Sequence, residues 1–410
     1  MATKYILPAA ISLALTPLVT QAATLEQLEK QVQNMNQRIA AQDQKFKVNG
    51  FASFAVSSTD ADSGDATYNR GVSNESNFQR YSKIGVQMTF NVDSDTSVTT
   101  QLVSRGENDY ATKAEWAYIK HNFGSGITGK MGRLRKPNYL LSEYFDVGYA
   151  MPWVQPPAEV YGVLENSANY DAFEFSYDMN FGDWSANAQV QYGRYVGEET
   201  KSDDLMAFNY SMNNGVLTFR AGYSQANVSI VPGSATDTAV TAANNALSFT
   251  DKADQQIEGT NLGTFMGLAA MYDDGSILAI TEYTSLTTEN LAPDQDAYYG
   301  MVGFRVGKVM PFISYASVKT TDDDDRDATR VVDLGAGPNA AIDAGIAALR
   351  ATYDKEQVRS TLGARYDYKP GIAVKFQYDM VDAKDTKGEF DSVPADGKVN
   401  VMTFSIDTVF

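Results

Sequence analysis

The sequence predicts an all-β fold, a transmembrane antiparallel β-barrel of about sixteen strands preceded by a short N-terminal coiled-coil helix. Three observations lead to this prediction. The chain opens with an apolar leader, apolar and polar residues alternate through most of its length, and the connections between alternating segments are short and long in turn. A leader indicates export, and the other two features are typical of a sheet closed into a barrel across a membrane.

The first segment, residues 1–22, reads MATKYILPAAISLALTPLVTQA. A basic residue, a short apolar run and small residues at the end are the pattern of a secretory signal peptide. A membrane-anchoring helix is the alternative, but the segment contains two prolines and its apolar run is shorter than the roughly 18 residues that cross a membrane. No later segment reaches that length. We therefore expect a signal peptide and no transmembrane helix after it.

Residues 23–46 carry apolar side chains at alternating spacings of three and four, with no glycine or proline between them. This heptad pattern predicts a coiled coil, and a lone amphipathic helix lying on a surface is the alternative. About three heptads are marginal for an isolated coil, so a larger body would have to hold the chains together. The predicted seam consists of Leu25, Leu28, Val32, Met35, Ile39, Gln42 and Phe46.

From Lys47 onward the pattern changes to a period of two. In residues 84–92, for example, Ile84, Val86 and Met88 lie on one face and polar residues on the other. Such alternation predicts strands with one apolar and one polar face, and about ten residues is the length of a transmembrane strand. The predicted strands cover residues 47–58, 80–92, 96–106, 111–122, 126–134, 168–180, 183–196, 204–213, 215–227, 260–273, 275–288, 296–307, 309–320, 355–368, 371–383 and 398–410.

The connections between these strands alternate in length. Short connections carry turn residues, such as DSD at 93–95 and DDG at 273–275. Short turns at one end and long loops at the other are the pattern of an outer-membrane barrel. A large soluble β-sandwich or β-helix is the alternative, and the leader, the even strand count and the loop asymmetry all disfavour it. The long connections cover residues 59–79, 135–167, 228–259, 321–354 and 384–397.

The stretch FGSGITGKMGR at 123–133 contains a G-x-G-x-x-G pattern and also resembles a phosphate-binding loop. A phosphate cradle needs a helix directly after its glycines, but Gly132 and Pro137 disfavour a helix there. Met131 also replaces the hydroxyl residue that would bind Mg²⁺. We interpret the stretch as a tight turn between two strands, with Gly124 and Gly126 supplying positive φ.

Composition argues against several classes of function. The chain has 51 acidic and 33 basic residues, a net charge of −18, which argues against a nucleic-acid partner. It has no cysteine and one histidine, His121, so we expect no metal site and no cofactor. A barrel hydrolase would use a histidine beside its nucleophile, and no G-x-S-x-G pattern is present. We therefore expect no enzymatic activity.

Taken together, the leader, the alternating strands, the long connection after the fifth strand, the Gly132-Arg133 pair and the terminal Phe410 resemble the trimeric porins of Gram-negative bacteria. The resemblance covers residues 47–410, with Thr408 as a small departure from the usual terminal pattern. Residues 23–46 resemble the periplasmic coiled coil of the porin group that includes the dicarboxylate-specific porins. The resemblance implies a homotrimer in the bacterial outer membrane, in contact with lipid and lipopolysaccharide, with Phe410 as an assembly signal.

The resemblance also implies that the connection at 135–167 folds into the barrel and narrows it. Its aromatic residues either pack against the barrel wall or form a platform for flat parts of a solute, and the sequence leaves both alternatives open. The candidate constriction residues are Arg135, Lys136, Tyr139, Glu143, Tyr144, Asp146, Tyr149, Trp153, Glu159 and Tyr161.

The polar faces of the predicted strands carry more bases than acids. The acids on these faces are Glu174, Asp178, Asp367 and Asp379. Any single cation could be paired with a neighbouring side chain, but as a group the cations predict a weak anion preference, because charged rings set ion preference in pores. The candidate lumen residues are Lys83, Arg105, Arg133, Arg220, Arg305, Arg359, Arg365 and Lys375.

Most of the negative charge lies in the predicted loops, most densely at 60–69 and 321–330. These acidic segments are either solvated loop tips or sites where divalent cations bridge to lipopolysaccharide. After the second of them, a short loop helix is predicted by residues at helical spacing, Ile342, Ile346, Leu349 and Tyr353.

The sequence thus predicts a channel for passive diffusion of small hydrophilic solutes. One alternative is a substrate-selective porin for small anionic solutes such as dicarboxylates. The other is a structural outer-membrane anchor that is tethered through its coiled coil.

Overall fold

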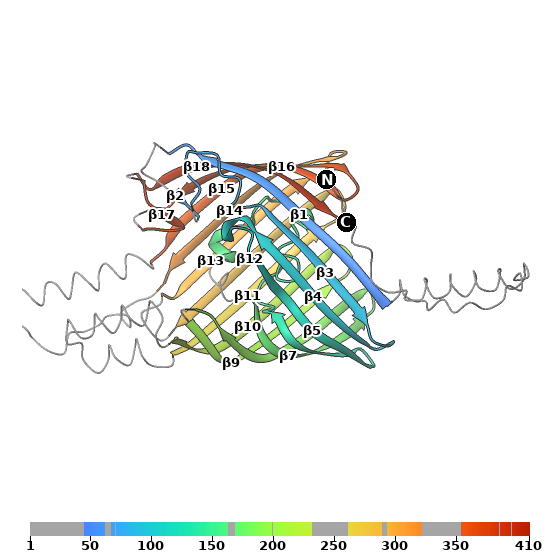
Figure 1. The fold of residues 1–410 in the computed structure, drawn as a ribbon. Helices are drawn as coiled ribbons and strands as arrows, with labels where there is room; N and C mark the ends of the chain where they lie inside the picture. The colour runs from blue at the N-terminus through green and yellow to red at the C-terminus, as the bar shows by residue number, and fades with distance from the viewer. Residues whose placement is uncertain are drawn as a thin grey trace, which may run out of the picture. The chain divides into compact units, whose positions relative to one another are not determined.

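A computed structural model of the chain describes residues 45–61, 67–69, 71–162, 169–198, 200–231, 261–288, 293–321, 354–384, 386–394 and 396–410. Most of them form one closed antiparallel barrel of sixteen strands (Figure 1). The strands follow one another around the barrel in chain order, and β1 closes the ring by pairing with both β3 and β18. Among the described residues, no helix is long and apolar enough to cross a membrane.

The barrel strands are β1 (Phe46–Thr59), β3 (Lys83–Asn91), β4 (Thr96–Arg105), β5 (Thr112–Gly124), β6 (Ile127–Arg135), β7 (Asn169–Phe181), β8 (Trp184–Val196), β9 (Thr200–Asn213), β10 (Leu217–Ile230), β11 (Asn261–Asp273), β12 (Ile277–Thr288), β13 (Gln295–Phe304), β14 (Val309–Thr320), β15 (Glu356–Lys369), β16 (Ile372–Asp382) and β18 (Lys398–Val409). The smaller elements are the strands β2 (Thr67–Tyr68) and β17 (Phe390–Ser392), the 3₁₀ turns η1 (Gly106–Asn108) and η2 (Gly148–Ala150), and the helix α2 (Ala158–Tyr161).

The predicted fold class is confirmed, because each predicted strand corresponds to a strand of the barrel. Most boundaries differ by one or two residues. The larger differences are that the strand predicted at 80–92 begins at Lys83, the one at 204–213 begins at Thr200, the one at 215–227 ends at Ile230 and the one at 296–307 ends at Phe304. Phe46 is a further correction. It was predicted as the last residue of the coiled-coil seam, but it begins β1 and pairs with Phe90. An apolar residue suits both a helical seam and an outward-facing strand position, so the pattern could not separate them.

The glycine turn predicted at 123–126 is confirmed as the connection between β5 and β6. Gly124 and Gly126 both have φ of +82°, a conformation that glycine adopts without steric cost. The side-chain oxygen of Asn122 accepts a hydrogen bond from the Gly124 N–H at 2.9 Å. No helix follows this turn, because β6 begins at Ile127.

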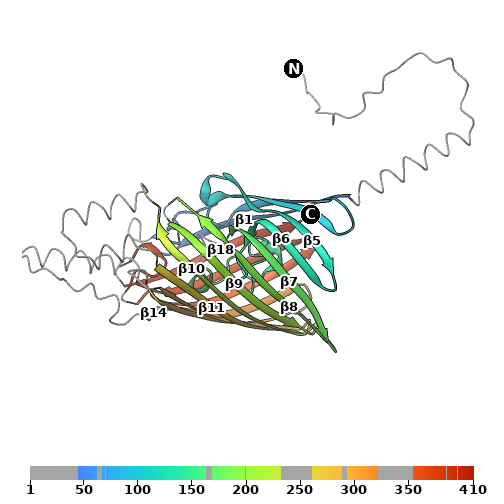
Figure 2. The ribbon, with the colours of Figure 1, turned by 90° about the horizontal axis from the view of Figure 1, so that it is seen from below.

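Alternation gives each strand an apolar outer face and a polar inner face. On β18, Met402, Phe404 and Ile406 are exposed on the outside, whereas Thr403, Ser405 and Asp407, which alternate with them, are buried inside. Neighbouring strands continue the same pattern, and Figure 2 shows β7 to β11 side by side along one flank. The barrel therefore has the outward apolar band and the polar interior of a membrane-spanning barrel.

The loops that follow β1 and β16 meet in a small capping layer. Their strands β2 and β17 pair, and the rings of Tyr68 and Phe390 pack edge to face at 5.2 Å. Both rings are buried in an apolar cluster with Val381 of β16 and Val399 of β18. Two loops separated by more than 300 residues thus form one body against the inner wall.

Several predictions fall outside the described residues. They are the signal peptide at 1–22, the seam positions from Leu25 to Gln42, the loop helix near 342–353 and most of the acidic segment at 321–330.

Candidate pore constriction

The connection after β6 lies inside the barrel. From Lys136 to Tyr161 most of its residues are buried, although they belong to a loop. They hydrogen-bond to inner-face residues of distant strands, such as Glu282 of β12 and Lys375 of β16. We call residues 136–162 the constriction loop, because they cross the interior of the barrel.

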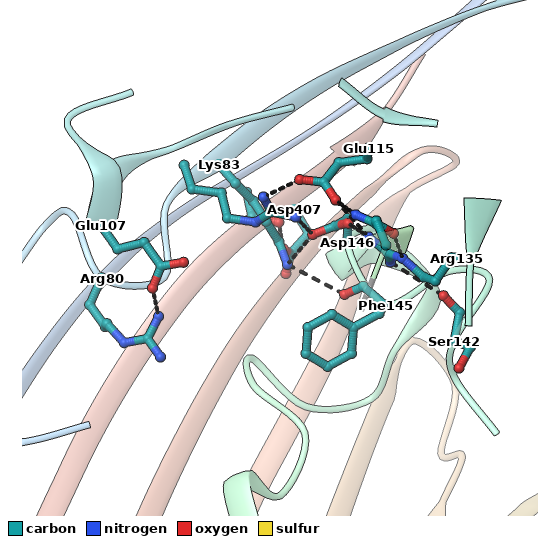
Figure 3. A network of polar contacts seen from close by, with 12 residues as sticks. Arg80, Lys83, Glu107, Glu115, Arg135, Ser142, Phe145, Asp146 and Asp407 are labelled. Atoms are coloured by element: carbon teal, nitrogen blue, oxygen red, sulfur yellow. Dashed lines mark hydrogen bonds and ion pairs between the residues drawn. The ribbon is translucent and has the colours of Figure 1, made fainter. Parts of the chain in front are cut away.

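Asp146 attaches the constriction loop to the wall formed by β4, β5 and β6 (Figure 3). Its two carboxylate oxygens lie 2.7 Å from Nη2 of Arg105 and 2.6 Å from Nη2 of Arg135. Glu115 of β5 also contacts both arginines, at 2.5 and 3.2 Å, and Lys83 lies 3.9 Å from Asp146. These three cations hold the pKa of Asp146 well below its usual range.

Lys375 of β16 attaches the middle of the loop to the stretch of wall formed by β16, β18 and β1. Its ammonium group donates to the backbone oxygens of Gly148 at 2.6 Å and Trp153 at 2.8 Å, and it lies 3.0 Å from a carboxylate oxygen of Asp407. Ser53 of β1 donates to the other oxygen of Asp407 at 2.5 Å. An ammonium group has three N–H donors, and one carboxylate and two carbonyl oxygens accept them here. This cluster therefore joins the loop to β1 and β18, the first and last strands of the barrel.

Arg359 and Arg365 of β15 attach the last part of the loop. Arg359 forms an ion pair with Glu159 at 2.8 Å, and Gln357 donates to the same carboxylate at 2.6 Å. Arg365 donates to the backbone oxygen of Met151 at 2.9 Å, and its guanidinium lies 4.8 Å from the ring centre of Tyr149. The loop is therefore attached to the wall at several points along its length.

The predicted aromatic residues of the loop divide into two groups. Tyr139, Trp153 and Tyr161 are buried in the main apolar cluster against β11 to β14, where Tyr139 and Tyr161 pack at 4.9 Å. Tyr144 and Tyr149 are half-buried, and burial raises the pKa of Tyr144 to about 12. Packing thus accounts for the first group, whereas the second group keeps part of its surface exposed.

The other predicted constriction residues lie at the start of the loop. Lys136 is buried, and burial lowers its pKa to about 7. Glu143 is exposed to the interior space, and its charge interacts with Lys130 of β6 and Arg220 of β10. Arg220 also donates to the backbone oxygen of Pro137 at 3.0 Å.

Arg133 is a correction to the predicted set of lumen residues. In the β6–β7 ladder Arg133 lies opposite Asp171, which is exposed. Arg133 also shares its face of β6 with Met131, which is 53% exposed on the outside of the barrel. Leu134 faces the interior instead and packs with Tyr170 in an apolar cluster. The exposed apolar stripe of β6 consists of Ile127 and Met131, which have the same parity as Arg133, so the assignment of Arg133 to the face opposite that stripe was wrong.

Most of the other predicted lumen cations lie beside a carboxylate. Beyond the pairs already described, Arg305 forms a double hydrogen bond with Asp273 at 2.6 and 2.8 Å, close to a short turn. Arg365 lies 2.8 Å from Asp367. The interior is therefore closer to electrically balanced than the sequence indicated.

Three interior acids were missing from the prediction. Glu115 lies at a β-bulge between β4 and β5, where the period of two breaks. Glu282 and Asp407 follow the alternation, between the outward-facing Thr281 and Tyr283 and between Ile406 and Thr408. A complete count of acids at inward positions would have found the last two, whereas the bulge residue had no signal in the pattern.

The closed sixteen-stranded barrel with an inward-folded loop is the fold of the outer-membrane porins. The chain is similar to OmpF of Salmonella typhi in complex with daunomycin, at 13% identity over 90% of this chain and 99% of that one, with a TM-score of 0.56. It is similar to an anion-selective porin from Comamonas acidovorans, at 15% identity over 89% and 99% of the two chains, with a TM-score of 0.54. A third structure is in-vitro folded OmpT of Vibrio cholerae in a trimer form, at 14% identity over 89% and 99%, with a TM-score of 0.52.

No protein-family model and no curated protein matches the chain. At 13 to 15% identity, the similarity to these structures defines the fold alone.

Proposed function

We propose that the protein is an outer-membrane porin through which small hydrophilic solutes diffuse passively. The observation that carries this proposal is the combination of an apolar outer surface with a polar interior that a charged loop narrows. Sixteen strands enclose a lumen wide enough for water and small solutes. Trimers in contact with lipid and lipopolysaccharide are part of the same proposal, with divalent cations at the acidic loops and a periplasmic coiled coil at 23–46.

We further propose that the channel discriminates weakly between ions. Arg105, Arg359 and Lys375 no longer support the predicted anion preference, because each of them contacts a carboxylate that neutralises its charge. The remaining balance lies between partly exposed cations such as Lys83 and the exposed Glu143. A weak anion preference is therefore the upper limit of what the interior supports.

Single-channel recording of the purified protein in a planar bilayer, under a salt gradient, tests this function. We expect discrete current steps in groups of three and a reversal potential close to zero. Block by a dicarboxylate, together with a strong anion preference, would favour the substrate-selective alternative. No conductance from correctly folded protein would contradict the channel and favour the structural anchor, and a turnover of lipid or peptide would overturn the expectation that the chain is not an enzyme.

A further inference from the structure

Glu282, on the inner face of β12, contacts both ends of the constriction loop. One carboxylate oxygen accepts the backbone N–H of Leu140 at 2.8 Å, at the start of the loop. The other accepts the hydroxyl of Tyr161 at 2.5 Å, at the end of the loop. Tyr299 of β13 lies 3.3 Å from the same oxygen. One side chain thus joins two loop positions that are separated by twenty residues.

The environment of Glu282 differs from that of the loop's own carboxylates. Asp146 and Glu159 each form ion pairs with arginine. Within the described part of the chain, no lysine or arginine forms an ion pair with Glu282, although the residue is only 2% exposed. Burial of a carboxylate is costly unless its oxygens accept hydrogen bonds. The donors from the two loop ends supply part of that compensation, beside the Tyr299 hydroxyl and the nearby charge of Arg220. Glu282 is therefore one attachment point that both ends of the loop share.

Packing around Glu282 brings the two ends of the loop together. The ring of Tyr161 lies 4.9 Å from that of Tyr139 and 5.5 Å from that of Phe145. Tyr139 also packs edge to face on Phe265 of β11 at 5.1 Å. A Cβ at Gly267 of β11 would lie 2.8 Å from the Asn138 oxygen, so the glycine permits the loop backbone to approach the wall here.

We propose that Glu282 is the positioning residue that sets the width of the constriction. It closes residues 140–161 into a ring on the wall, and the ring presents Asp146 and Gly148 to their partners on other strands. The expected changes in conductance rest on the proposed porin function. The expected change in the position of the loop does not rest on that function, and it can be measured separately.

The experiment combines substitutions at this clamp with a probe of loop motion. Glu282→Leu removes the acceptor for both loop ends, and Tyr161→Phe removes only the hydroxyl donor. Thr284→Val is the matched control, because Thr284 is equally buried two residues along the same face of β12. The chain has no cysteine, so Ala150→Cys places a single nitroxide label on an exposed position in the middle of the loop.

We expect the label at position 150 to be more mobile in Glu282→Leu than in the parent protein, to be intermediate in Tyr161→Phe and to be unchanged in Thr284→Val. Unlabelled Glu282→Leu channels should show larger open-channel noise and a changed step size, with assembly and thermal stability of the barrel retained. Equal label mobility in folded Glu282→Leu and parent protein would overturn the proposal. If the leucine variant does not fold, unchanged mobility in Tyr161→Phe overturns it, and increased mobility supports it.

The two proposals can fail separately. A parent protein that folds but does not conduct contradicts the porin function, and the label still reports whether Glu282 holds the loop. A conducting parent protein with unchanged label mobility in both variants contradicts only the role of Glu282.

Discussion

At the scale of single residues, most of the basic side chains inside the barrel lie beside carboxylates that neutralise them. Asp146 illustrates the effect, because two arginines and a lysine surround one carboxylate. Such groups contribute little net field to the lumen, but they attach the loop strongly, since removal of one partner leaves a buried charge without compensation.

The depressed pKa of Asp146 predicts how the loop responds to acid. A carboxyl group whose pKa is lower in the folded than in the unfolded state stabilises the folded state fully above its unfolded value of about 3.9. This contribution is lost as the pH falls through the folded pKa. The thermal stability of the parent protein should therefore exceed that of Asp146→Asn by a constant amount between neutral pH and about pH 4, and the difference should shrink in more acidic solution.

Glu143→Gln is the control for this measurement, because Glu143 is an exposed carboxylate on the same loop. A difference between parent and Asp146→Asn that grows on acidification would contradict the role of Asp146.

Lys375 provides a second prediction at this scale. Lys375→Met leaves Asp407 buried without its cation and should lower the free energy of unfolding by about 3–5 kcal/mol. The double variant Lys375→Met with Asp407→Asn removes both charges and should recover part of that loss. Urea unfolding of the folded barrel in detergent measures both values. Equal stability of the single variant and the parent would show that the Lys375–Asp407 pair does not stabilise the barrel.

At the scale of elements, the constriction loop depends on its close approach to the wall. A Cβ at Gly148 would collide with the side chains of Asp407 and Ser53, so only glycine permits the loop to lie against β18 and β1 at this point. The same principle acts at Gly267 on β11, where the wall supplies the glycine and the loop supplies the backbone oxygen of Asn138.

Gly148→Ala should therefore displace the middle of the loop and change the single-channel conductance. Gly300→Ala is the matched control, because a Cβ there meets no atom within 4 Å. Conductance is recorded for both variants in the same bilayer. A changed conductance in the control, or an unchanged one in Gly148→Ala, would contradict the steric argument.

At the scale of the whole molecule, the barrel closes between its first and last strands. The N–H and C=O groups of Gly50 and Phe410 exchange hydrogen bonds at 2.7 and 2.9 Å, next to the ladder that pairs β1 with β18. The Phe410 ring lies against Gly50 and is 68% exposed on the outside. The last residue therefore takes part in closure, which gives a physical basis for its proposed role in assembly.

Deletion of Phe410 should lower the yield of folded barrel, because both closing hydrogen bonds and the ring contact are lost. The folded fraction is measured by the change in gel mobility on heating, after refolding into detergent. Phe410→Leu is the control, since it keeps the backbone groups and an apolar side chain. A normal yield from the deletion would show that closure does not need the terminal residue.

The sequence by itself determined the strands, their number and the end of the barrel at which the long loops lie. These features follow from local patterns, because alternation and turn residues act over a few positions. That the connection at 135–167 folds inward was implied by the resemblance to the porins and not by a local pattern. Alternation assigned most interior charges to the correct face, but Arg133 was assigned to the wrong one, although it has the parity of the exposed Ile127 and Met131.

Only the tertiary structure decided which charges meet. Arg359 and Glu159 are 200 residues apart, and Lys375 contacts Gly148, which is 227 residues earlier in the chain. A period of two places a side chain inside or outside, but it carries no information about what lies opposite, since partners across a lumen are set by barrel closure and by the path of the loop. For this reason the sequence predicted a basic inner wall, whereas in the folded protein most of these basic side chains form ion pairs.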